Sequence, residues 1–179
     1  MLTTQSTYRI AITGPESTGK SELSRKLAEH YNSIWVPEYA REYLSQLNRG
    51  YRYEDILSIA RGQVKLEEER IAGANKYLFC DTELLVCKIW SEEKFGKCDP
   101  WILEKLRTQH YDLYLLCNTD ILWKPDPLRE NPDDRNRLFN LYQKELQEND
   151  FPFEIIQGTG EKRVNSAIKA IEAHQFHNL

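Results

Sequence analysis

Short apolar runs alternate along the chain with segments of helical periodicity. Five such runs occur, at residues 8–13, 34–36, 77–80, 112–117 and 153–156. Between them, apolar residues recur every three or four positions, as Leu23, Leu27 and Tyr31 do after the first run. Strands that alternate with helices predict a parallel sheet whose two faces are both covered by helices. We therefore expect a three-layer α/β fold that forms one domain over residues 1–179.

The segment from Ala40 to Asn75 has a continuous helical pattern. Ile56, Ala60, Val64, Ile71 and Ala74 fall on one apolar face of it. The charged residues at positions 65 and 67–70 fall mostly outside that face. They predict a solvated surface rather than a site.

Composition narrows the class of protein. The hydrophobic and charged fractions, 40% and 29%, are those of an ordinary globular chain. The net charge of -4 provides no positive field for a nucleic-acid backbone, so nucleic acid is not an expected partner. No basic leader or long apolar span is present, so we expect a cytoplasmic protein with no membrane contact. Nothing in the sequence indicates an oligomeric state.

The four cysteines offer two interpretations. They contain no C-x-x-C pair, and Cys80 and Cys117 lie inside apolar runs. Structural zinc requires closely spaced ligand pairs. Buried core thiols are therefore the favoured prediction, and a metal site is the alternative.

The loop after the first apolar run carries the strongest motif. Residues 14–21 read GPESTGKS, which matches G-x-x-x-x-G-K-[ST] between a predicted strand and a predicted helix. Such a loop directs successive backbone N–H groups at a phosphate. Lys20 would reach the β- and γ-phosphates and Ser21 would bind Mg²⁺. The motif predicts a P-loop NTPase fold that binds ATP through Gly14, Glu16, Ser17, Thr18, Gly19, Lys20 and Ser21.

Asp81 ends the third apolar run. The acidic residue that binds Mg²⁺, directly or through water, usually occupies this place in P-loop proteins. An acid there could also cap the next helix. We expect Asp81 to serve with Ser21 at the metal.

The rest of the chain favours a small-molecule kinase over a switch or a motor. A guanine-reading N-K-x-D is absent, because Asn75-Lys76 is followed by Tyr77-Leu78. The chain is short for the sensor and lid elements of a large ATPase. A kinase must also orient the hydroxyl of an acceptor beside the γ-phosphate.

Candidate acceptor residues follow the second apolar run. Glu38 could accept the hydroxyl proton, and Arg41, three residues later, could pair with it or clamp substrate. Trp35 and Tyr39 could stack on a flat base. The alternatives are a helix-start acid, a surface ion pair and core aromatics.

Residues 123–137 are rich in proline and charge and predict a lid. Arg129 is the expected stabiliser of charge on the triphosphate. An ordinary surface connection is the alternative. Pro132, followed by two aspartates, predicts the start of the next helix. Thr159, after the last run, could lie beside adenine or cap the last helix.

Together these segments resemble the nicotinamide riboside kinase domain of the bifunctional NAD-biosynthesis regulators, within the NadR-like group of small P-loop ATPases. The similarity covers nearly the whole chain. Its landmarks are GPESTGKS, EYAREY at 38–43, Gly62-Gln63, CDTE at 80–83, and Trp123, Asp126 and Arg129 in the lid.

The resemblance implies transfer of the ATP γ-phosphate to the 5'-hydroxyl of nicotinamide riboside. It implies roles for Lys20, Glu38, Asp81 and Arg129 in catalysis, and for Gln63, Trp123 and Asp126 in substrate binding. Which acid is the base stays open. A kinase for another nucleoside or small alcohol and a nucleotide-binding regulatory module are the alternatives.

Two features depart from the family pattern. Pro37 stands where relatives carry tryptophan before the glutamate, although Trp35 lies on the same strand face. The chain also begins a few residues before its first predicted strand. Relatives carry an adenylyltransferase domain there, so we expect another protein to complete NAD synthesis.

Overall fold

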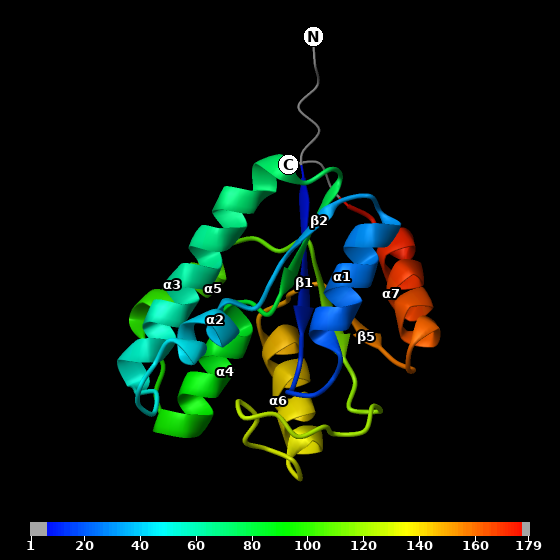
Figure 1. Ribbon diagram of the computed structural model, residues 1–179. Helices are drawn as coiled ribbons and strands as arrows, with labels where there is room; N and C mark the ends of the chain where they lie inside the picture. The colour runs from blue at the N-terminus through cyan, green and yellow to red at the C-terminus, as the bar shows by residue number, and fades with distance from the viewer. Residues whose placement is uncertain (1–6, 177–179) are drawn as a thin grey trace.

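A single parallel sheet organises the chain. The computed structural model describes residues 7–176 (Figure 1). Its strands are β1 (Tyr8–Thr13), β2 (Ile34–Val36), β3 (Tyr77–Asp81), β4 (Leu113–Cys117) and β5 (Phe153–Ile156). They pair in parallel in the order β2-β3-β1-β4-β5. The predicted strands and the P-loop NTPase fold class are confirmed.

Helices cover both faces of the sheet (Figure 1). One layer consists of α1 (Lys20–His30) and α7 (Glu161–Ala173). The other contains α2 (Tyr39–Ser45), α3 (Tyr53–Arg70), α4 (Leu84–Phe95), α5 (Pro100–Thr108) and α6 (Arg135–Glu148), with a 3-10 turn at Ile71–Gly73. Across residues 7–176, no helix combines the length and apolar character needed to cross a membrane.

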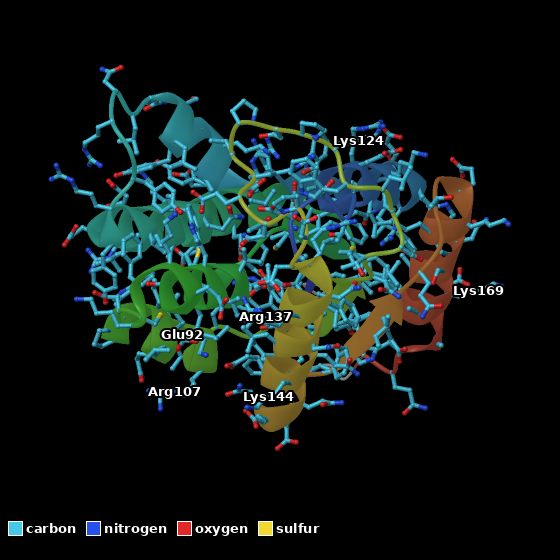
Figure 2. The ribbon with its side chains drawn as sticks, turned by 90° about the horizontal axis from the view of Figure 1, so that it is seen from below. Glu92, Arg107, Lys124, Arg137, Lys144 and Lys169 are labelled. Carbon is cyan, nitrogen blue, oxygen red and sulfur yellow. The ribbon has the colours of Figure 1, made fainter. Side chains whose placement is uncertain are left out.

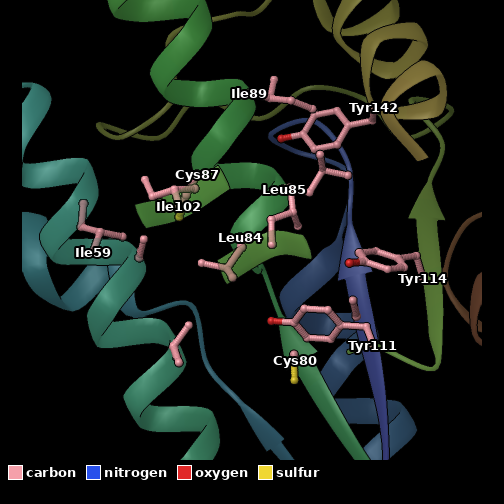
Figure 3. Packing of buried hydrophobic residues seen from close by; sticks show 14 of the residues in the cluster. Ile59, Cys80, Leu84, Leu85, Cys87, Ile89, Ile102, Tyr111, Tyr114 and Tyr142 are labelled. Carbon is pink, nitrogen blue, oxygen red and sulfur yellow. The ribbon is translucent and has the colours of Figure 1, made fainter. Parts of the chain in front are cut away.

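Successive strand residues point to opposite faces of the sheet and pack into two hydrophobic cores. Ile10 and Ile12 of β1 pack with α1 and α7, whereas Ala11 joins the core of the opposite face. Figure 3 shows the core that contains Ala11, in which Cys80, Tyr111 and Tyr114 pack with the layer of helices α2 to α6. The Cys80 and Cys117 thiols are free and fully buried, as predicted for core cysteines. Because all strand pairs are parallel, the carboxyl ends of the strands lie at one edge of the sheet.

The continuous helix predicted from Ala40 is interrupted. The chain leaves helix between Ser45 and Tyr53 and restarts as α3. The Asp55 carboxylate accepts the Arg52 N–H at 2.6 Å and pairs with Arg49 at 2.7 Å, which fixes the new start. Hydrogen bonds from Arg49 hold the pKa of Asp55 well below its usual range. Periodicity alone did not reveal this cap.

Glu67 contradicts the predicted solvated face, because its side chain is fully buried. Gln109 donates to its carboxylate at 2.7 Å and Tyr111 at 2.9 Å, and the Arg9 guanidinium lies 3.9 Å away. Burial raises the pKa of Glu67 to about 7. The charged run therefore contains one residue that ties α3 to the sheet.

One further helix and one helix boundary also differ from the sequence pattern. The α5 helix was not predicted, although Asp99 accepts the Trp101 N–H at 2.9 Å and Pro100 occupies the first turn. The α6 helix begins at Arg135, with Asp134 as its N-cap, rather than at Pro132.

Candidate functional site

The loop between β1 and α1 has a backbone that its glycines require. Gly14 has φ 125° and Gly19 has φ 77°, both in the region that favours glycine. A Cβ atom at Gly14 would also come within 2.9 Å of the Cys117 carbonyl oxygen on β4. The loop therefore curls tightly against the sheet edge and leads directly into α1, as an anion-binding P-loop must.

Lys20 and Thr18 close this loop on itself. The Lys20 Nζ atom donates to the Gly14 and Pro15 carbonyls at 2.9 and 2.7 Å. The Thr18 hydroxyl donates to the Pro15 carbonyl at 2.8 Å. These contacts hold a positive charge across the mouth of the loop.

Asp81 is buried at the end of β3 and its Oδ1 atom has no partner among the described residues. Burial raises the pKa of Asp81 to about 6, and the Glu38 carboxylate adds to the rise, while Ser21, Lys20 and Arg41 oppose it. Such a carboxylate is stabilised by a cation. Across residues 7–176 no group of three or more His, Cys, Asp or Glu forms a metal cluster. Magnesium that also binds phosphates needs only one or two carboxylates, so Asp81 and Ser21 fit it.

Glu83 was given no role by the sequence pattern, yet it lies fully buried beneath the loop. Its carboxylate accepts the Leu85 N–H at 2.6 Å and the Thr13 hydroxyl at 2.8 Å. Burial raises the pKa of Glu83 to about 7. Glu83 therefore caps α4 and joins the ends of β1 and β3.

Glu38 directly precedes α2 and connects to the lid through Arg41. The Arg41 Nε atom lies 3.0 Å from the Glu38 carboxylate, and its Nη1 atom lies 3.0 Å from Asp126. The Glu38–Arg41 pair thus forms as the spacing predicted, and it extends to a lid residue. These three side chains are 22–44% exposed, so a ligand can reach the linked ion pairs.

A cavity of about 1000 Å³ opens between the loop, α2, α4, α6 and the lid. It is lined by most of the predicted site: Gly14, Glu16, Ser17, Thr18, Gly19, Lys20, Ser21, Glu38, Arg41 and Arg129. Its volume is that of a large ligand site, enough for a nucleotide with a second small molecule.

Several other predicted residues do not line this cavity. Trp35 packs against the core beneath α1 and α7, Tyr39 lies on Gly62 of α3, and Thr159 is exposed after β5. An added Cβ at Gly62 would meet the Tyr39 ring at 2.0 Å, so this glycine allows α2 and α3 to pack. Trp123 and Asp126 contact the cavity residues Glu16 and Arg41, whereas Gln63 accepts the Tyr39 N–H.

Aromatic lining comes from residues that the pattern missed. Tyr51 and Trp90 line the cavity, with ring centroids 4.9 Å apart. The Trp90 Nε1 atom donates to the Tyr51 hydroxyl at 3.1 Å, and that hydroxyl donates to Glu130 of the lid at 2.8 Å. Tyr51 lies in the unpredicted break between α2 and α3, so no periodic signal marked it.

Glu16 connects the P-loop to the lid rather than facing the loop's interior. Its carboxylate accepts the backbone N–H groups of Glu130 and Asn131 at 3.0 and 2.7 Å, and the Trp123 indole N–H at 3.3 Å. In Figure 2, the lid that carries Lys124 crosses the end of the molecule where the P-loop lies. The lid is closed on the loop.

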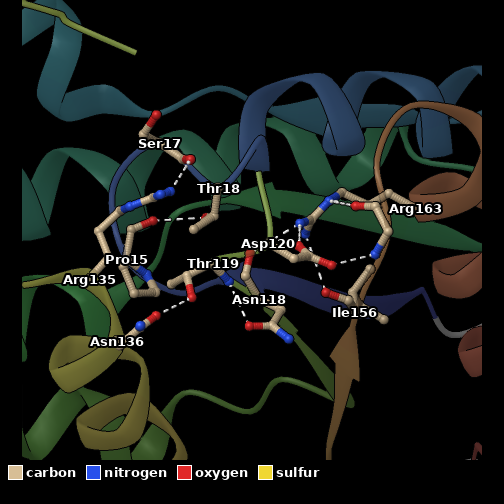
Figure 4. Close-up of polar contacts among 11 residues, drawn as sticks. Pro15, Ser17, Thr18, Asn118, Thr119, Asp120, Arg135, Asn136, Ile156 and Arg163 are labelled. Carbon is tan, nitrogen blue, oxygen red and sulfur yellow. Dashed lines mark hydrogen bonds and ion pairs between the residues drawn. The ribbon is translucent and has the colours of Figure 1, made fainter. Parts of the chain in front are cut away.

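Ser17 makes a second set of lid contacts. Its hydroxyl accepts the Lys124 N–H at 2.9 Å and an Arg129 N–H at 3.3 Å. Arg135, at the start of α6, donates to the Ser17 carbonyl at 2.9 Å (Figure 4). Arg129 therefore lies at the P-loop, where the sequence predicted a lid arginine.

Arg163 organises the neighbouring loops after β4 and β5. Arg163 is 3% exposed, and its guanidinium donates to the Gly158 carbonyl at 2.8 Å and the Asn118 carbonyl at 3.0 Å (Figure 4). It also pairs with Asp120, which accepts the Gly158 N–H at 2.6 Å. The loop that carries Thr159 is thereby fixed against the loop after β4.

Comparison with known proteins places the chain in a family. The profile of a family described as an AAA domain matches residues 9–163, most of the chain. The chain belongs to this AAA-domain family. Among curated relatives, the trifunctional NAD biosynthesis/regulator protein NadR of Escherichia coli K12 is 31% identical over 150 residues, which cover 80% of this chain and 37% of NadR. NadR of Salmonella typhimurium gives the same values. The chain thus spans little more than a third of these relatives.

Solved structures share the fold. A crystal structure of NadR in complex with NR has a TM-score of 0.81 at 22% identity and covers 97% of this chain and 54% of NadR. Deoxyadenosine kinase of M. mycoides has a TM-score of 0.63 at 13% identity and covers 93% of this chain and 100% of the kinase. At these identities the likeness concerns the family's architecture.

Proposed function

We propose that the protein is an ATP- and Mg²⁺-dependent kinase that phosphorylates the 5'-hydroxyl of nicotinamide riboside to give nicotinamide mononucleotide. The observation that carries the proposal is the single cavity shared by the P-loop lysine and by Glu38 and Arg41. A kinase needs a phosphate site and an acceptor site that face one enclosed space. The 31% identity to NadR supports nicotinamide riboside as the acceptor.

The P-loop would hold the triphosphate. Its backbone amides and the N-terminus of α1 bind phosphate oxygens, and Lys20 moves from the loop carbonyls to the β- and γ-phosphates. Ser21 and Asp81 would hold Mg²⁺, which supplies charge neutralisation on the phosphates when bound. Arg129, already at Ser17, neutralises charge on the transferred phosphoryl group.

Glu38 would orient the acceptor hydroxyl and accept its proton. It lines the same cavity as the P-loop, and its carboxylate pairs with Arg41 at 3.0 Å. Asp81 is the less suitable base, because its carboxylate would be occupied with Ser21 at Mg²⁺. The pyridinium ring of the acceptor carries a positive charge, which the faces of Tyr51 and Trp90 would attract. We assign them this role in place of Trp35 and Tyr39.

A second acceptor class has an observation in its favour. Deoxyadenosine kinase and a thymidylate kinase of Ehrlichia chaffeensis share the fold over 100% and 99% of their own lengths. Another nucleoside or nucleotide is therefore the alternative acceptor.

One assay separates these functions. The protein is incubated with ATP, Mg²⁺ and a panel of nicotinamide riboside, deoxyadenosine, thymidine and thymidine monophosphate, and products are separated by mass. We expect nicotinamide mononucleotide. Phosphorylation of another acceptor would identify that compound as the substrate instead. Nucleotide binding without any phosphorylated acceptor would favour a regulatory module.

A further inference from the structure

A second, much smaller pocket lies where the start of α2 meets α3 and α4. Its volume is about 20 Å³. Glu38, Ala40, Val86 and Trp90 line both this pocket and the large cavity, so the two spaces adjoin. Gln63 and Thr82 line the small pocket but not the large cavity. The pocket is therefore a side chamber on the Glu38 side of the cavity.

The Gln63 side chain has a fixed orientation. Its Oε1 atom accepts the Tyr39 N–H at 2.9 Å, and only an oxygen can accept from that donor. The Nε2 end is consequently turned to the rest of the pocket. Gln63 is 2% exposed, and among the described residues Nε2 has no hydrogen-bond partner. A buried amide donor thus stands ready for an acceptor.

Thr82 provides a second polar group. It is 4% exposed, and its hydroxyl also lacks a partner among the described residues. Its φ of 68° is unusual for a β-branched residue, and the neighbouring Glu83, bonded to Leu85 and Thr13, holds it there. A strained backbone that places a hydroxyl in a pocket is typical of a ligand site.

Leaving both groups unpaired is costly, since a buried donor without a partner has lost its hydrogen bonds to water and gained none in return. A space of about 20 Å³ holds little more than one water-sized atom. A whole ring therefore cannot enter, but one oxygen of a substituent can. The Nε2 donor selects an oxygen that accepts a hydrogen bond.

We propose that Gln63 and Thr82 determine acceptor specificity by binding one carbonyl-type oxygen carried on the acceptor's ring, the carboxamide oxygen in the case of nicotinamide riboside. This inference rests on the proposed function and assigns that site's selectivity. The oxygen enters the side chamber from the cavity past Glu38, and the ring stays in the cavity beside the Tyr51–Trp90 pair. Acceptors without such an oxygen leave Nε2 unpaired and are disfavoured.

The test compares nicotinamide riboside with the riboside of unsubstituted pyridine. For the wild type we expect kcat/KM to favour the carboxamide by tenfold or more. Gln63→Glu keeps the oxygen that accepts the Tyr39 N–H but replaces the donor, so the preference should fall to within about threefold. Thr82→Ala should reduce the preference and Thr82→Ser should restore it. The KM for ATP should stay within about twofold in every variant that folds.

Gln147→Glu, an exposed change on α6, is the matched control and should leave the preference unchanged. If the wild type phosphorylates both ribosides equally well, or if Gln63→Glu keeps the preference, the specificity role is overturned while the kinase assignment stands. If the wild type phosphorylates neither riboside, the proposed function fails and this inference fails with it. A crystal structure in which a water stays in the side chamber beside bound nicotinamide riboside would also overturn it.

Discussion

The nucleotide half and the acceptor half of the cavity are built in different ways. The nucleotide half is one continuous segment, 14–21, whose shape depends on two glycines and on the start of α1. The acceptor half collects Glu38, Tyr51 and Trp90 from three separate segments. A local motif can specify the first half, whereas only the packing of α2, α3 and α4 assembles the second. Variants in the two halves should therefore fail in different ways.

The largest effect is expected in the nucleotide half. Lys20→Ala removes the cation that lies at the mouth of the loop, and we expect kcat to fall by about 10³-fold or more. Steady-state kinetics with saturating ATP measures it. Lys169→Ala, an exposed change on α7, is the matched control (Figure 2). Activity within a few-fold of wild type would show that the loop does not hold the transferred phosphate.

Glu67 tests the packing that supports the acceptor half. Its pKa is about 7 in the fold against 4.5 ordinarily, so the folded protein binds more protons than the unfolded chain between those values. Stability is then lost as pH rises through this range. In the wild type, Glu67 should therefore lower the free energy of unfolding by roughly 3 kcal/mol between these pH values, and Glu67→Gln should abolish that decrease. Urea unfolding at pH 4.5 and 7.5 measures it.

Glu69→Gln, whose carboxylate is 57% exposed, should leave the pH dependence unchanged. The titratable groups around Glu67 are Arg9, Cys80, Glu83 and Tyr111. An unchanged slope in Glu67→Gln would mean that the Arg9 pair keeps this carboxyl ionised throughout.

Glu38→Gln separates binding from chemistry in the acceptor half. We expect kcat to fall by roughly 10²-fold while ATP binding is retained, since the amide cannot accept the hydroxyl proton. Rapid-quench kinetics and ATP titration measure the two quantities. Glu42→Gln, exposed on the same helix, serves as control. An unchanged kcat in Glu38→Gln would transfer the base role to Asp81.

The smallest effect concerns the contact between the P-loop and the lid. Glu16→Ala removes the acceptor of two lid N–H groups, so the lid should open more often. We expect hydrogen exchange at Glu130 and Asn131 to accelerate by about tenfold. Glu29→Ala, exposed on α1, should not change it. Equal exchange in both variants would mean that Ser17 and Arg135 alone hold the lid.

The sequence predicts the sheet and the P-loop well because their signals are local. Each strand is a short apolar run, and GPESTGKS fixes a backbone shape by itself. The break between α2 and α3 and the burial of Glu67 depend on partners distant in the chain, such as Arg49 and Tyr111. The same reason explains the aromatic residues. Trp35 and Tyr39 lie near Glu38 in sequence but pack elsewhere. Tyr51, in the break between α2 and α3, and Trp90 of α4 line the cavity and contact each other there.

The central claim is that the two halves act on one phosphoryl group. Transfer from ATP labelled in its γ-phosphate, with nicotinamide riboside present, tests it most directly. The account predicts that the label appears on the 5'-oxygen of nicotinamide mononucleotide, in step with the formation of ADP. Label found only in inorganic phosphate, with the riboside recovered unchanged, would contradict it.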